Sequence, residues 1–123
     1  MKFREIVLAS GAKIFLGKNA KNNDELIKKY KGKENIIFHT ATPGSPFCVI
    51  EDLKPSKETL SLSGAACARY SQDWRDNKGD VKVHQFTGKD IRKPLLKKAG
   101  TWKIKNKPKL IKVKKEDIIK WQH

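Results

Sequence analysis

The sequence is poor in acidic residues and in cysteine, and it contains no long apolar run. Its 13 Asp and Glu residues stand against 28 Lys and Arg residues, which gives a formal net charge of +15 over 123 residues. Cys48 and Cys67 lie far apart in apolar runs, which predicts two buried, reduced thiols and excludes a disulfide framework. No segment approaches the ~20 apolar residues of a membrane span, and the N-terminus lacks the apolar core of a signal peptide. We therefore expect a cytoplasmic protein that does not associate with membranes.

The remaining composition is sufficient for one folded domain. Hydrophobic residues make up 37% of the chain and charged residues 33%, which is too apolar for a disordered segment. The length lies near the commonest domain size, and we find no repeat or linker. Strand-like and helix-like segments do not alternate strictly. The sequence thus predicts a single α+β domain over residues 1–123, with a mostly antiparallel or mixed sheet packed by two or three helices.

Apolar alternation and turn residues predict where the strands lie. The predicted strands cover residues 3–8, 12–16, 36–38, 47–50, 81–86, 102–104 and 111–113. Asn22, with Glu25 three residues later, predicts the start of a helix that Gly32 ends. A second helix is predicted at 57–75, and its face of small residues implies close packing against the sheet. The core is expected to span about 3–113, followed by a short C-terminal helix at 115–122.

The basic excess is concentrated near the C-terminus. Residues 81–123 hold 14 of the Lys and Arg residues but only three of the acidic ones. If 102–104 and 111–113 are neighbouring strands, the Lys residues between their inward apolar positions face solvent in rows. Such a surface can neutralise several phosphates without touching the bases. We favour a polyanion site over a merely solvated face. Membrane binding is disfavoured because the charge falls on strands and loops and not on an amphipathic helix.

Candidate catalytic and metal sites are weak. The three histidines lack metal-ligand spacing, and neither Cys67 (mid-helix among alanines) nor Cys48 (in a strand) has a neighbour that would activate a thiol. His39 is of more interest because it ends an apolar strand and enters a loop of Thr, Pro, Gly and Ser. Residues 17–19, before a helix, are compatible with a backbone anion site or an ordinary turn, and they match no nucleotide-binding motif. We expect no enzymatic activity, no metal and no cofactor.

Four stretches of the chain, in order, resemble the motifs of one known family. They are Gly-Lys-Asn at 17–19 with Asn-Asp-Glu-Leu at 23–26, Asn-Ile-Ile-Phe-His at 35–39 with Pro-Gly-Ser at 43–45, Ala-Ala-Cys-Ala-Arg-Tyr-Ser at 65–71, and Val-Lys-Val at 81–83 with Lys89, 92–94 and 100–102. The chain thus resembles the NFACT-R domain, the RNA-binding module of ribosome quality-control factors, which also occurs as a free-standing small protein. The resemblance covers about residues 12–113. Asn35, Ile37 and Pro46 stand where the family usually has Asp, Trp and His.

The resemblance implies an α+β fold and binding to RNA, either tRNA or rRNA, in translation quality control or RNA modification. The implied partners are RNA and the ribosome or an RNA-modification enzyme, and the oligomeric state is left open. A second hypothesis is a basic protein-interaction adaptor that docks an acidic partner such as an RNA-modifying enzyme. Charge and motif order together predict a set of RNA-binding residues: Lys18, Asn19, His39, Ser45, Lys82, Arg92, Lys93, Lys97, Lys98, Lys103 and Lys105.

Overall fold

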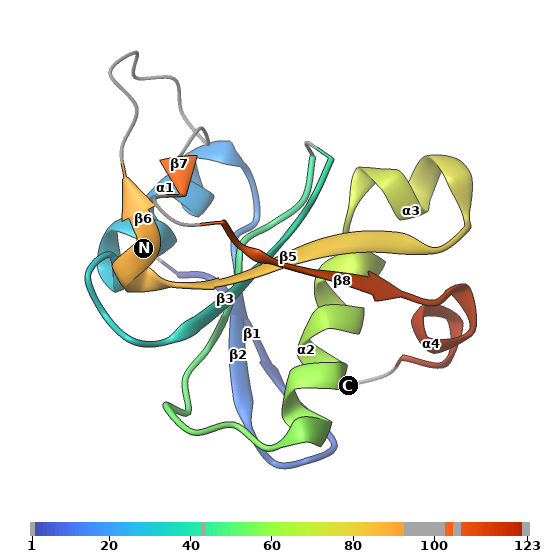
Figure 1. Cartoon of the computed structure of the whole chain (residues 1–123), viewed down its shortest axis with the longest axis horizontal. Coiled ribbons are helices and arrows are strands. Elements are labelled where there is room, and N and C mark those ends of the chain that lie inside the picture. Colours follow the sequence, from blue (N-terminus) through green and yellow to red (C-terminus); the bar gives the residue numbers. More distant parts are fainter. Residues whose placement is uncertain (1, 43, 93–102, 105–106, 122–123) are drawn as a thin grey trace.

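The main sheet of the computed structural model is antiparallel throughout its described strands (Figure 1). The structure describes residues 2–42, 44–92, 103–104 and 107–121. Six strands follow the order β1-β2-β4-β3-β5-β8. Their bounds are β1 Arg4–Val7, β2 Lys13–Leu16, β3 Ile36–Thr40, β4 Cys48–Ile50, β5 Val81–Thr87 and β8 Lys109–Val113. A separate two-stranded sheet joins β6 (Ile91–Arg92) to β7 (Lys103–Ile104).

Helices cover the main sheet on both of its faces. The described helices are α1 (Ala20–Tyr30), α2 (Lys57–Arg69), α3 (Gln72–Asn77) and α4 (Lys115–Lys120), with a 3-10 turn at Gly88–Asp90. Figure 1 shows α1 beside β6 and β7, apart from α2, α3 and α4. The predicted α+β fold with an antiparallel sheet is confirmed.

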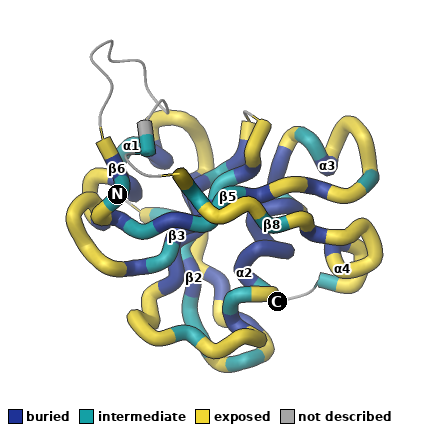
Figure 2. Tube along the Cα trace, in the orientation of Figure 1, coloured by how far each residue is buried: buried dark blue, intermediate teal, exposed yellow. Residues whose placement is uncertain are grey.

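Period-two alternation in the central strands produces two separate hydrophobic cores. In β3, Phe38 packs in the core under α2, whereas Ile37 packs in the core that contains the apolar side of α1. Both side chains are fully buried, because β3 and β4 have helices or strands on each face. Figure 2 shows β3 largely buried, while the edge strand β8 is largely exposed. The sheet is therefore a partition between the α1 core and the α2 core.

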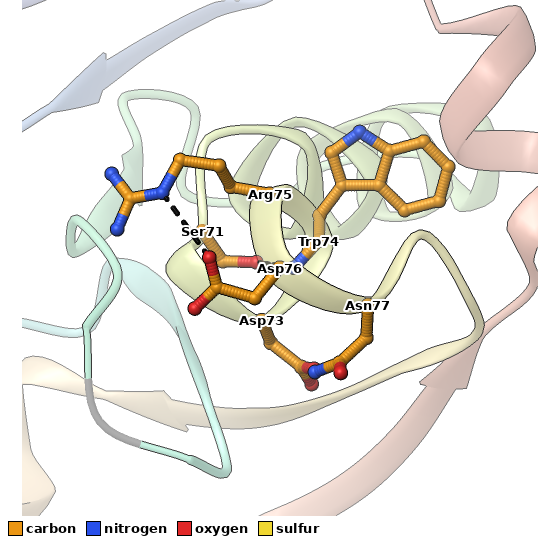
Figure 3. Close-up of polar contacts among 6 residues, drawn as sticks. All are labelled: Ser71, Asp73, Trp74, Arg75, Asp76 and Asn77. Atoms are coloured by element: carbon orange, nitrogen blue, oxygen red, sulfur yellow. Dashed lines mark hydrogen bonds and ion pairs between the residues drawn. The ribbon is translucent and has the colours of Figure 1, made fainter.

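The long helix predicted at 57–75 is two helices. α2 ends at Arg69, and the Ser71 hydroxyl accepts a hydrogen bond from the Trp74 amide at 3.1 Å, which caps α3. Figure 3 shows α3, in which the Asn77 amide also donates to Asp73 at 2.7 Å. Serine is among the best N-cap residues, so its local bond competes successfully with continued helix. The chain therefore turns at 70–71.

The start of α1 also differs from the prediction. Asn19 is the N-cap, since its side-chain oxygen accepts a hydrogen bond from the Asn22 amide at 2.8 Å. Asn22 lies inside the helix and is buried, and its side-chain oxygen accepts from the Lys18 amide at 2.9 Å. Two asparagines three residues apart make both starts locally plausible. Burial of Asn22 under the chain near Lys2, whose carbonyl accepts its amide, selects the earlier start.

The predicted pairing of the two Lys-rich strands is wrong. β7 pairs with β6, and β8 pairs with β5, so the segment at 103–104 is not a neighbour of β8. The two strands separate because their apolar side chains pack in different cores. Ile104 packs in the α1 core with Ile91, whereas Ile111 and Val113 pack in the α2 core. A hairpin through residues 106–108 would have forced these side chains into the same core.

Smaller expectations about the elements are mostly confirmed. The β1–β2 hairpin forms with Ile6 opposite Ile14, and β3 and β4 pair across the loop between them. Val113 is buried and Lys112 is exposed, as the alternation of β8 predicts. Helix α4 ends at Lys120, short of the predicted 122. The predicted contribution of residue 102 lies outside the described residues.

Two glycines give a matched test of this packing. A Cβ on Gly64 of α2 would lie 3.8 Å from Phe38 and from Val113, an ordinary contact, whereas a Cβ on Gly88 would overlap the Tyr30 carbonyl oxygen. We expect Gly64→Ala to raise the free energy of unfolding by up to ~1 kcal/mol, because alanine is the better helix former. Gly88→Ala should lower it by about 2–3 kcal/mol through overpacking. Urea denaturation of both variants provides the measurement, and equal effects would contradict this packing.

Candidate functional site

A cleft of about 450 Å³ lies where three segments of the chain meet. These are the turn from β2 into α1, the end of β3 with the loop that follows it, and the junction between α2 and α3, and Arg4 of β1 lies beside them. The cleft is lined by Arg4, Gly17, Lys18, Asn19, Ala20, Asn23, His39, Gly44, Ser45, Pro46 and Tyr70. Four of the predicted binding residues, Lys18, Asn19, His39 and Ser45, are thus brought together although they are separated by up to 27 positions in sequence.

The side chain of Asn23 joins two walls of the cleft. Its amide nitrogen donates to the Ser45 carbonyl at 3.2 Å, and its oxygen accepts from the Phe47 amide at 3.0 Å. The Gly17 amide donates to the Phe47 carbonyl at 3.3 Å. A Cβ on Gly17 would overlap the Asn23 oxygen, so only glycine permits this approach. The Gly-Lys-Asn turn and the loop after β3 are therefore fixed to each other.

The loop between β3 and β4 is fixed from its other side as well. Gly44 adopts φ +96°, a left-handed conformation suited to glycine, and its carbonyl accepts from the Gln72 amide of α3 at 2.7 Å. The hydroxyl of Ser45 is buried and accepts from the Thr40 amide at 3.0 Å. Ser45 therefore shapes the loop from within. Its hydroxyl positions the backbone of the loop.

His39 presents a neutral ring to the cleft. Its Nδ1 lies 2.9 Å from the Thr40 carbonyl oxygen, and since a carbonyl only accepts, Nδ1 carries the proton. In that tautomer Nε2 is a hydrogen-bond acceptor. Burial lowers the pKa of His39 below its ordinary value, and nearby His84 acts in the same direction, against the opposing effect of the Thr40 hydrogen bond. The ring also packs on Phe47, with centroids 4.5 Å apart.

Arg4 and Tyr70 belong to the cleft although the sequence did not single them out. The Arg4 guanidinium carbon lies over the Tyr70 ring, 4.7 Å from its centroid. Tyr70 in turn meets Trp121 edge to face, with centroids 5.9 Å apart. The tyrosine lies within the Ala-Ala-Cys-Ala-Arg-Tyr-Ser stretch, which was a detectable signal. No local pattern marks Arg4, because its place depends on the pairing of β1 with β2.

Lys82 lies on the sheet face that continues from the cleft. It is directly opposite Lys112 in the β5–β8 pair, and both side chains are exposed. On the same face of β5, His84 is opposite His39 of β3. Like charges directly opposite each other in a sheet repel, and the carboxylate that pairs with Lys112 is Asp80, at 3.7 Å. Positive charge thus extends from the cleft toward the sheet edge.

The remaining predicted basic residues fall in or near the segment after β6. Arg92 is exposed on β6, beside buried Ile91. Lys103 is placed only as a backbone position, opposite Arg92 in the β6–β7 pair. Lys93, Lys97, Lys98 and Lys105 lie outside the described residues. The rows of lysine on one sheet face that the sequence predicted therefore do not form, and Arg92 and Lys103 belong to the smaller sheet.

Two of the three departures from the family pattern lie in the core. Ile37 is fully buried against α1, and Asn35 is buried, with its amide donating to the Ile50 carbonyl at 3.0 Å. Ile37 thus contributes to the α1 core, and Asn35 holds the end of β4. Pro46, the third departure, does line the cleft, so a proline stands there where the family pattern has a histidine.

The described residues offer little for metal or thiol chemistry. They contain no group of three or more His, Cys, Asp or Glu side chains arranged to hold a metal. In the same part of the chain, no helix has the length and apolar character needed to cross a membrane. Cys48 and Cys67 are fully buried, as predicted. Burial raises the pKa of Cys67 to about 12, against the opposing effect of hydrogen bonds with Ser45 and Thr40, and burial raises the pKa of Cys48 well above its ordinary value.

The sequence over residues 2–106 matches the family described as "NFACT protein RNA binding domain". The chain belongs to this family. The NFACT domain is 31% identical to the archaeal Rqc2 homolog aRqcH of Methanocaldococcus jannaschii over 94 residues, which is 75% of the chain and 14% of that protein. It is 32% identical to the Rqc2 homolog RqcH of Streptococcus suis over 108 residues, 87% of the chain and 19% of that protein. The chain therefore spans less than a fifth of these relatives.

A solved structure shares the fold of the NFACT domain. The C-terminal part of the fibronectin/fibrinogen-binding protein of Streptococcus suis superposes with a TM-score of 0.83 at 25% identity. The match covers all of the present chain and 50% of the other. The suspected family resemblance is thus confirmed.

Burial of both cysteines predicts low thiol reactivity in the native NFACT domain. Because the thiolate is the reacting form and both pKa values are raised, we expect labelling at pH 8 about 100-fold slower than in denaturing urea. Ellman's reagent, followed with and without urea, gives the two rates. A cysteine that reacts rapidly in the folded protein would contradict the packing of α2 against β4 and would favour an enzymatic role.

Proposed function

We propose that this domain binds tRNA or rRNA in translation quality control or in RNA modification. The observation that carries the proposal is the convergence of the first three family motifs on one cleft, bordered by the cations Arg4 and Lys18. Among the described residues neither cation forms an ion pair. Cations held at a cleft without carboxylate partners are suited to a polyanionic ligand. The Rqc2 homologues that contain a matching domain support the cellular context.

The bound RNA would extend from the cleft over the neighbouring basic surface. Lys82 is directly opposite Lys112, and phosphates placed between them would offset the repulsion that remains beside the Lys112–Asp80 ion pair. Arg92 and the predicted lysines 93, 97, 98, 103 and 105 would add phosphate contacts. Phosphate contacts of this kind orient the RNA without reading its sequence. The ribosome or an RNA-modification enzyme would then be a partner through the shared RNA.

Salt dependence tests the electrostatic part of this proposal. We expect the logarithm of the affinity for tRNA or an rRNA fragment to fall linearly with the logarithm of salt concentration, by about 0.7–0.9 per neutralised phosphate. Lys18→Glu should weaken binding by about fivefold and flatten the slope, and adding Lys82→Glu should weaken binding further. Fluorescence anisotropy between 50 and 300 mM salt measures both quantities.

Lys57→Glu is the matched charge control. Lys57 is an exposed lysine at the first position of α2, at the opposite end of that helix from Tyr70 and the cleft. The same change of charge there should alter RNA affinity by less than about twofold. If both charge reversals weaken binding equally, the cleft has no special role. Recovery of an acidic protein partner from nuclease-treated extracts, with no RNA affinity at any salt concentration, would favour the adaptor hypothesis instead.

A further inference from the structure

The size of the cleft limits what can enter it. Its volume of about 450 Å³ lies in the range of pockets that enclose a small ligand. A nucleic-acid duplex is far wider than such a pocket and can only pass over its rim. A single nucleotide that is not stacked on its neighbours in the RNA can enter the cleft. The rigid attachment of the walls through Asn23 and Gln72 indicates that the pocket is formed before any ligand arrives.

One side of the cleft supplies cations and an N–H donor, and the other side supplies a hydrogen-bond acceptor. Arg4 and Lys18, which supply positive charge, come from neighbouring chain segments, since Arg4 is opposite Leu16 in the β1–β2 pair. Next to them is the exposed Ala20, whose backbone amide finds no acceptor in the described part of the chain. His39 comes from the other wall and offers a neutral Nε2 acceptor. A phosphate can bind to Arg4, Lys18 and the Ala20 amide, whereas a hydroxyl or N–H group can donate to His39.

Planar surfaces complete the cleft. The Arg4 guanidinium is held over Tyr70, and Pro46 also lines the cleft. Proteins that recognise single-stranded RNA stack unpaired bases on aromatic rings and on guanidinium planes, and they read the 2′-hydroxyl by hydrogen bonds. The cleft thus combines a place for a phosphate, a hydrogen-bond acceptor and a stacking surface within the space of one nucleotide.

We propose that the cleft holds one unstacked ribonucleotide, with its phosphate between Arg4 and Lys18 and its ribose or base donating to His39 Nε2. The proposal rests on the proposed function and specifies the part of the RNA that is recognised: a bulge, a loop or a free end. The surface around Lys82 and Lys112 would contact the flanking backbone. RNA with an unpaired nucleotide is then preferred to a continuous duplex.

The test compares three RNAs of equal length: a blunt duplex, the same duplex with one bulged nucleotide, and a single strand. We expect the bulged RNA to bind at least about tenfold more tightly than the blunt duplex. AMP, GMP, CMP and UMP serve as monomeric probes in ¹H–¹⁵N NMR titrations. At least one of them should shift the amide signals of Lys18, Asn19 and Ser45 and leave that of Lys57 unchanged.

Variants of His39 separate its role in recognition from its role in packing. His39→Phe keeps a ring against Phe47 but removes the acceptor, so the preference for the bulge should fall to within about threefold of the blunt duplex. His39→Gln, which can restore an acceptor near the place of Nε2, should recover part of the preference. Duplex affinity should stay the same in both variants. Urea denaturation of each variant shows that it is folded.

The outcomes distinguish the single-nucleotide pocket from RNA binding by the domain as a whole. If bulged and blunt RNA bind equally and no nucleotide shifts the cleft signals, the single-nucleotide pocket is wrong and RNA binding stands. If His39→Phe retains the full preference for the bulge, the assignment of the acceptor is wrong. If no RNA binds at any salt concentration, the proposed function and the pocket fail together.

Discussion

The site depends on the side chain of Asn23, whose two polar ends are both occupied by the backbone of another segment. Its amide and its oxygen join α1 to the start of β4, and the space that they occupy requires glycine at position 17. A buried amide that loses such partners costs about 1–3 kcal/mol for each unsatisfied group. Asn23 is buried, so alternative positions of α1 relative to β4 are penalised by that amount. The cleft takes its shape from this constraint.

The positive charge of the domain contributes little to holding it together. The described ion pairs are exposed, as between Lys13 and Glu5 at 3.6 Å or between Lys89 and Glu34 at 3.2 Å, and exposed pairs add only a few tenths of a kcal/mol. Burial of apolar side chains on both faces of the sheet stabilises the fold instead. Most of the cations in the described part of the chain form no ion pair and would be available to a polyanion. An excess of one charge repels itself in the compact state and opposes folding slightly, and a bound polyanion would relieve that repulsion.

Local patterns in the sequence predicted the strands, the small-residue face of α2 and the burial of both cysteines, because each depends on neighbours within a few positions. The local patterns gave wrong predictions where contacts between residues far apart in the sequence determine the structure. Tyr70 and Ser71 interrupt a long helical pattern through a capping bond that competes with a continued helix. Ile104 has the same apolar character as Ile111, and nothing local shows that one packs under α1 and the other under α2.

In the candidate site, too, local patterns predicted some residues, and contacts between distant segments determined the others. Lys18, Asn19, His39 and Ser45 were selected from loops and motifs, and the fold brings them together. Arg4 was missed because it reaches the cleft only through the pairing of β1 with β2 and through contact with Tyr70, 66 positions away. Loop composition can show that residues are available for binding. It cannot show which strand end will stand beside them.

The partition of the interior into two cores has a consequence for cooperativity. The walls of the cleft come from both sides of the sheet: residues 17–20 lead into α1, whereas Tyr70 lies between α2 and α3 and packs against the α2 core. Each half has its own apolar contacts and can open locally at its own free energy. A ligand that touches both walls binds only when both halves are closed, and its binding energy opposes either opening. Occupancy of the cleft would thus strengthen the coupling between two units that the empty domain already joins through the sheet and through the loop between β3 and β4.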